Sequence, residues 1–120
     1  MILVDTSVWV EHLRSGNVTL AGALAAGRVL AHPLVIGELA CGHLQNRREV
    51  LDLLGRLPSV PTATHPEALA FLDRRALMGR GIGFIDVHLL ASTALAASTR
   101  LWTRDRRLAT IASELNLAYE

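Results

Sequence analysis

A chain of 120 residues, 51% of them hydrophobic, is long enough to bury one core and too apolar to be disordered. All 12 basic residues are arginine, and together with the 11 acidic residues they give a formal net charge of +1. A chain without lysine cannot use P-loop phosphate binding or Schiff-base catalysis, and its balanced charge neither favours nor excludes a nucleic-acid partner.

Short apolar segments predict buried strands. The first runs from Ile2 to Val4 and ends at Asp5. Three further strands are expected at residues 28–31, 59–61 and 100–103, the one at 59–61 being brief.

Helices are expected between these strands, because apolar residues recur at helical spacing and Asn, Pro and Gly stand near the expected helix ends. In chain order the expected helices cover residues 7–14, 17–26, 33–44, 46–57, 66–78 and 84–97, and a last one follows Asp105 and ends at Asn116. Strands that alternate with helices predict an α/β fold. We expect a single domain, residues 1–120, with a short central parallel sheet flanked by helices on both faces.

The sequence also predicts a soluble, cytoplasmic protein with no membrane partner. Cys41 is the only cysteine, so no intrachain disulfide can form. Met1 leads directly into an apolar run without the basic region and cleavage site of a signal peptide. The longest apolar stretch, residues 87–97, is too short to span a bilayer.

Four carboxylates stand among apolar neighbours, where an unpaired charge is costly. Asp5 ends the first strand, Asp86 opens the most hydrophobic helix, and Asp105 follows the last strand. Each of these three could simply cap a helix. Glu38 lies within a helix that we expect to be buried on all sides, so its alternative role is a buried ion pair with an arginine.

Taken together, the four acids indicate a metal site. Sites in parallel sheets form beyond the carboxyl ends of the strands, where Asp5 and Asp105 stand. Carboxylates brought together repel one another, and a divalent cation compensates that repulsion. Oxygen ligands without a His or Cys pair favour Mg²⁺, with Mn²⁺ as a substitute. Such a cluster suits phosphodiester hydrolysis, which predicts a nuclease whose metal ligands and catalytic residues are Asp5, Glu38, Asp86 and Asp105.

Four segments follow one another along the chain: ILVDTSVWVEHLR, PLVIGELACG, GIGFIDVHLLAS and LWTRDRRL. In this order they resemble PIN-domain ribonucleases, and more narrowly the VapC toxins of type II toxin–antitoxin systems. The resemblance covers essentially the whole chain. The family's four acids match Asp5, Glu38, Asp86 and Asp105, and its supporting hydroxyls match Thr6, Ser7 and Thr103.

The resemblance implies a Mg²⁺-dependent endoribonuclease that cleaves structured RNA such as tRNA or rRNA. It also implies a homodimer and a cognate VapB antitoxin that neutralises the enzyme. Arg80 lies in a glycine loop ahead of Asp86, where it either binds an RNA phosphate or is simply solvated.

Two other functions fit the same residues. The chain could be a non-enzymatic PIN-like module that receives a basic peptide in its acidic pocket. It could also be a PIN nuclease that acts on DNA, or in RNA processing, without an antitoxin. Metal-dependent cleavage separates the module from both nucleases, and a neighbouring antitoxin reading frame separates the two nucleases.

Overall fold

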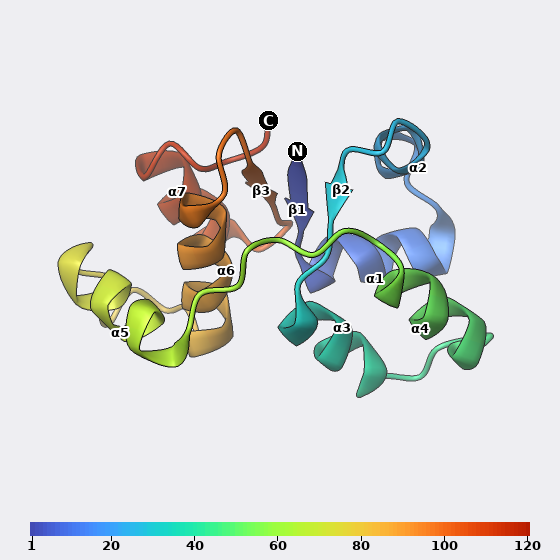
Figure 1. Ribbon diagram of the computed structural model, residues 1–120, viewed down its shortest axis with the longest axis horizontal. Helices are drawn as coiled ribbons and strands as arrows, with labels where there is room; N and C mark the ends of the chain where they lie inside the picture. The colour runs from blue at the N-terminus through green and yellow to red at the C-terminus, as the bar shows by residue number, and fades with distance from the viewer.

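Three short parallel strands form the centre of the molecule (Figure 1). The computed structural model describes residues 1–120, and its strands are β1 (Ile2–Val4), β2 (Val29–Leu30) and β3 (Arg100–Trp102). Their order is β2-β1-β3, and β1 pairs in parallel with both neighbours. Ile2 stands opposite Val29 on one side and Arg100 on the other, which confirms the predicted parallel sheet.

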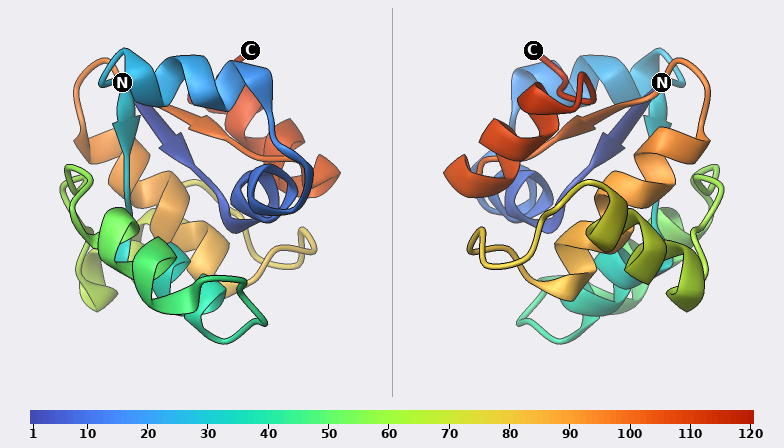
Figure 2. Two further views of the ribbon diagram at one scale, coloured as in Figure 1. Left: turned by 90° about the vertical axis from the view of Figure 1, so that its right-hand side faces the viewer. Right: turned by 90° about the vertical axis from the view of Figure 1, so that its left-hand side faces the viewer.

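Seven helices surround the sheet, so the expected α/β fold class is confirmed. Figure 2 shows α6 on one side of the strands and α2 and α7 on the other. The helices are α1 (Thr6–Ser15), α2 (Val18–Ala25), α3 (Pro33–Ala40), α4 (Arg47–Gly55), α5 (His65–Arg74), α6 (Phe84–Leu95) and α7 (Arg106–Glu114). None of them has the length and apolar composition needed to cross a membrane.

Several predicted element ends were wrong. Helix α3 ends at Ala40 rather than at residue 44, and the chain then turns until Asn46, which is left-handed with φ 53°. Helix α5 ends at Arg74 rather than at residue 78, because Ala76 is also left-handed, with φ 53°. The strand expected at 59–61 is reduced to a single bridge between Ser59 and Ala31.

The core joins β1 to helices on both sides of the sheet. Leu3 and Val4 are fully buried, as are Leu89 and Leu90 of α6. Each buried leucine of this size contributes roughly 1.5–3 kcal/mol through removal from water. Helix α6, predicted to be central, is therefore anchored in the core by Leu89 and Leu90.

His32 is a fully buried polar residue that joins two elements. Its Nδ1 accepts the Leu34 backbone N–H at 3.0 Å and thereby caps α3. Because Nδ1 is an acceptor, the neutral ring carries its proton on Nε2 and donates it to the Ser92 hydroxyl of α6, 3.2 Å away. Burial, assisted by the nearby His88, lowers the pKa of His32 to about 4.

We expect acid to destabilise this protein through His32. The unfolded ring titrates near its ordinary value of 6.5, whereas the folded ring titrates near 4. The contribution of the neutral His32 ring to the stability of the folded protein is therefore complete above about pH 6.5 and is lost as the pH falls towards 4. Between these values the free energy of unfolding should fall by up to about 1.4 kcal/mol per pH unit on account of this group.

Urea titrations at pH 7, 6 and 5 measure that dependence. His32→Asn keeps a capping acceptor and cannot titrate, so its pH dependence should be shallower than that of the wild type. The matched variant His43→Asn alters an exposed histidine and should retain the wild-type slope. Equal slopes for His32→Asn and the wild type would contradict this account.

Candidate functional site

The four predicted acids reach one edge of the sheet from different elements. Asp5 immediately follows β1, and Asp105 lies three residues beyond the end of β3. Glu38 belongs to α3, which follows β2, and Asp86 lies in the first turn of α6. Because the strands are parallel, their carboxyl ends share this edge, where α/β proteins place their ligands.

Asp5 is the most buried of the four, with only 6% of its surface exposed. One carboxylate oxygen accepts the Thr6 backbone N–H at 2.7 Å. The other accepts the hydroxyls of Ser7 at 2.9 Å and Thr103 at 2.7 Å. A buried carboxylate with three donors is fixed in position, and these donors satisfy a group that would otherwise be costly to bury.

Thr103 links the ends of two strands. Its hydroxyl donates to Asp5 and accepts the Asp105 backbone N–H at 3.0 Å. Asp105 in turn caps α7 by accepting the Leu108 N–H at 3.0 Å. Ser7 accepts the Arg104 N–H at 3.0 Å in the same way. The β1 and β3 ends are therefore tied together through hydroxyl groups beside the acids.

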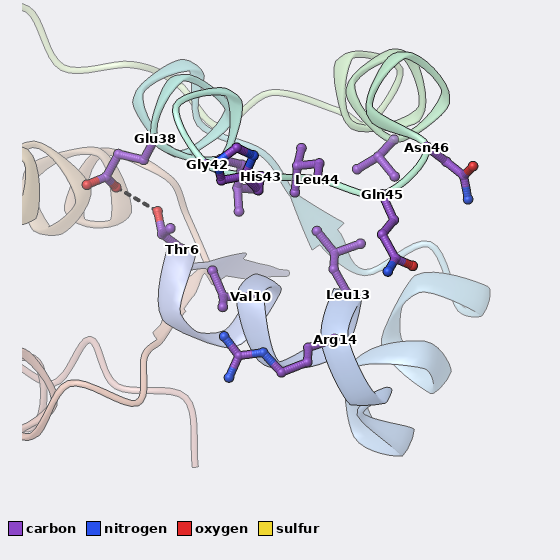
Figure 3. Close-up of a pocket in the computed structure, with 12 residues that line it drawn as sticks. Thr6, Val10, Leu13, Arg14, Glu38, Gly42, His43, Leu44, Gln45 and Asn46 are labelled. Atoms are coloured by element: carbon purple, nitrogen blue, oxygen red, sulfur yellow. Dashed lines mark hydrogen bonds between the residues drawn. The ribbon is translucent and has the colours of Figure 1, made fainter.

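Glu38 corrects one expectation from the sequence. It was expected in a helix buried on all sides, but it lies on the exposed face of α3, next to the exposed Gly37. No buried ion pair is therefore required. Figure 3 shows its carboxylate turned towards Thr6, whose hydroxyl donates to Glu38 Oε1 at 2.6 Å. This hydrogen bond joins α1 to α3 at the edge of the site.

Asp86 is the third residue of the α6 helix rather than its cap. Gly83 occupies the cap position, and its N–H donates to Asp86 Oδ2 at 3.1 Å. Burial raises the pKa of the Asp86 carboxyl above its ordinary value, and the Gly83 hydrogen bond opposes that shift. The charges of Asp5, Asp105 and Glu38 raise the same pKa further, so all four acids act in one electrostatic cluster.

No arginine neutralises this cluster. The structure contains three salt bridges, and none involves any of the four acids. Arg104 lies next to Asp105 in sequence, yet its guanidinium pairs with Glu11. Arg80 pairs with Glu114 of α7 through two hydrogen bonds, at 3.0 and 2.8 Å. Its predicted contact with RNA stays a prediction, and any phosphate would have to compete with Glu114.

The donor set fits a hard divalent cation. All four charged groups offer oxygen, and one oxygen of each of Glu38, Asp86 and Asp105 makes no hydrogen bond. No group of three or more acidic, histidine or cysteine side chains lies close enough together in this structure to hold a metal ion. Mutual repulsion opposes closer approach of carboxylates whose charge is not compensated.

The helix-cap role considered for Asp105 is confirmed, since its carboxylate accepts the Leu108 N–H at the start of α7. Sequence reasoning missed the other backbone donor of the site, the N–H of Gly83, which orients Asp86. The missing signal was position within the helix. A carboxylate at the third residue of a helix reaches back to the cap, so the Gly83–Asp86 pair could have been anticipated from its spacing.

Two comparisons agree with this geometry. The family model described as the PIN domain matches residues 2–114. Ribonuclease VapC32 of Mycobacterium tuberculosis, in strains H37Rv and CDC 1551, is 50% identical over 118 residues, which is 98% of this chain and 95% of the relative. The chain therefore belongs to the PIN-domain family and is a homologue of the VapC ribonucleases.

Proposed function

We propose that residues 1–120 act as one PIN domain, a Mg²⁺-dependent endoribonuclease toxin that a VapB-type antitoxin neutralises. One arrangement carries the proposal: the four acids lie at one strand edge and none of them pairs with an arginine. The charges of Asp5, Asp105 and Glu38 add to the effect of burial in raising the pKa of Asp86. The identity with a relative named a ribonuclease supports RNA as the substrate. A tRNA or rRNA target, a cytoplasmic location and a homodimer complete the proposal.

The chain's own residues prepare the site in three ways. Thr6, Ser7 and Thr103 fix Asp5 before any ligand arrives. Glu38, Asp86 and Asp105 each keep one oxygen available as a ligand. When bound, Mg²⁺ or Mn²⁺ would activate a water molecule and stabilise the negative charge on the phosphate. A basic antitoxin side chain entering the same cluster would neutralise it and compete with the cation.

Loss of the buried acid should abolish cleavage. Asp5→Asn is expected to lower the rate of RNA cleavage in Mg²⁺ by about a hundredfold or more, because it removes a charged ligand and keeps the shape. Asp52→Asn, which alters an exposed acid of α4 paired with Arg56, should cleave at the wild-type rate. Gel assays with and without EDTA measure both variants.

Full activity of Asp5→Asn would refute the assignment of the site. Cleavage of DNA and not of RNA would leave the hydrolytic chemistry in place and exclude an RNA substrate. Tight binding of a basic peptide by a wild-type protein that never cleaves would instead identify a non-enzymatic module.

The charged carboxylate of Asp86 is expected to lower the stability of the metal-free protein and to contribute to metal binding. A raised pKa means that the charged form is disfavoured by folding, so stability falls as the pH rises from the ordinary value of 3.8 through the folded pKa. Without metal at pH 7.5, Asp86→Asn should melt about 2–5 °C above the wild type. Saturating Mn²⁺ should raise the melting temperature of the wild type but not that of the variant.

Thermal unfolding in EDTA and in Mn²⁺ checks this prediction. Asp73→Asn, which alters an exposed acid outside the site, is the matched control and should respond to Mn²⁺ like the wild type. A metal response of equal size in Asp86→Asn would remove Asp86 from the ligand set.

Thr103 should act by positioning Asp5. Thr103→Val keeps the side-chain shape and removes the hydroxyl's hydrogen bonds with Asp5, the Asp105 N–H and Ser7, so the affinity for Mn²⁺ should fall by about tenfold. Thr103→Ser retains the hydroxyl and should restore that affinity. Calorimetric titration of Mn²⁺ into the three proteins distinguishes this positioning role from a purely structural one, in which serine would not rescue.

A further inference from the structure

A pocket of about 590 Å³ opens beside the acidic cluster, between α1 and the segment that joins α3 to α4. Figure 3 shows Val10 and Leu13 of α1 on one side and His43 and Leu44 on the other. The hydrogen-bonded pair of Thr6 and Glu38 lies at one end. Pocket and cluster therefore share Glu38, and its hydrogen-bond partner Thr6 also lines the pocket. The pocket volume is within the range that binds small organic ligands.

The lining combines apolar walls with a few polar groups. Val10 and Leu13 are 39% and 38% exposed, which leaves apolar surface accessible on α1. The ring of His43, the amide of Gln45 and the guanidinium of Arg14 also line the pocket. Arg14 takes part in none of the three salt bridges. Such groups suit a nucleotide. Its base needs a flat surface to stack on, the edge of the base needs an amide for hydrogen bonding, and the phosphate needs a cation.

We propose that this pocket binds one unstacked nucleotide of the RNA, next to the phosphodiester bond that is cleaved. The inference rests on the proposed function and extends it to substrate selection. Because Glu38 lines the pocket as well as the acidic cluster, a strand whose phosphate reaches Glu38 can place an adjoining nucleotide in the pocket. This continuity through the Thr6–Glu38 pair favours a substrate nucleotide over a docked protein segment. The base lies between α1 and residues 42–45, and the Gln45 amide reads its edge.

Filling the pocket tests the proposal. Leu13→Trp places an indole in the space, and Gln45→Ala removes the amide. Leu53→Trp is the matched control, because Leu53 is an exposed leucine of α4 outside the pocket. The assay is cleavage of a randomised RNA pool in Mg²⁺, with sequencing of the products and KM measured on one chosen substrate.

The wild type should prefer certain bases at one position beside the cut. Leu13→Trp should lose that preference and raise KM by about tenfold, the scale of one stacked base. Gln45→Ala should relax the preference, and Leu53→Trp should match the wild type. If Leu13→Trp does not fold, as judged by its melting temperature, the base preference of Gln45→Ala decides.

An unchanged base preference in both pocket variants would overturn the proposal. So would a Leu13→Trp protein that keeps its RNA preference and loses a basic partner peptide, because the pocket would then dock protein. If the wild type never cleaves RNA, the proposed function fails separately. The pocket is then tested by photocrosslinking of RNA that contains 4-thiouridine: crosslinks at residues 10–14 or 42–46 support it, and crosslinks found only elsewhere refute it.

Discussion

Because β1 pairs in parallel with β2 on one side and with β3 on the other, all three strands direct their carboxyl ends to the same edge of the sheet. The strands have only two or three residues each, so every chain segment that leaves this edge does so close to the others. Asp5 and Thr103 meet there directly across the strand ends. The placement of the acids on α3 and α6 follows from the same arrangement, since both helices begin or pack at this edge.

This arrangement opposes stability locally. The pKa of Asp86 is raised by burial and by three neighbouring charges, although 12 arginines were available in the chain to neutralise them. Arg104, which precedes Asp105 in the sequence, and Arg80, in the loop before Asp86, pair with Glu11 and Glu114 instead. Such a residual cost is typical of functional sites, where groups are held for a ligand rather than for the folded state. Hydrogen bonds from hydroxyl and backbone donors hold the acids in place without cancelling their charge.

The Thr6–Glu38 hydrogen bond joins the candidate metal site to the pocket proposed to bind a nucleotide. On one side lies the acidic cluster, and on the other the pocket between α1 and the segment after α3. Helix α3 ends at Ala40, and residues 42–46 of the segment that follows it line this pocket.

The sequence by itself determined the parallel α/β architecture and pointed to four acids as a candidate site. Apolar segments that end in Asp5 or lead to Asp105 are local patterns, and local patterns can be recognised in a sequence without a structure. Sequence could not decide the exposure of Glu38, the ends of α3 and α5, or the partner of Arg80. Each of these depends on which surface a neighbouring element covers: Glu38 lies on the face of α3 that stays open, and Arg80 meets Glu114 across 34 residues of chain. Only the tertiary structure decided whether Arg80 and Arg104 would neutralise the acids, because the fold brings these two arginines into reach of Glu114 and Glu11 instead.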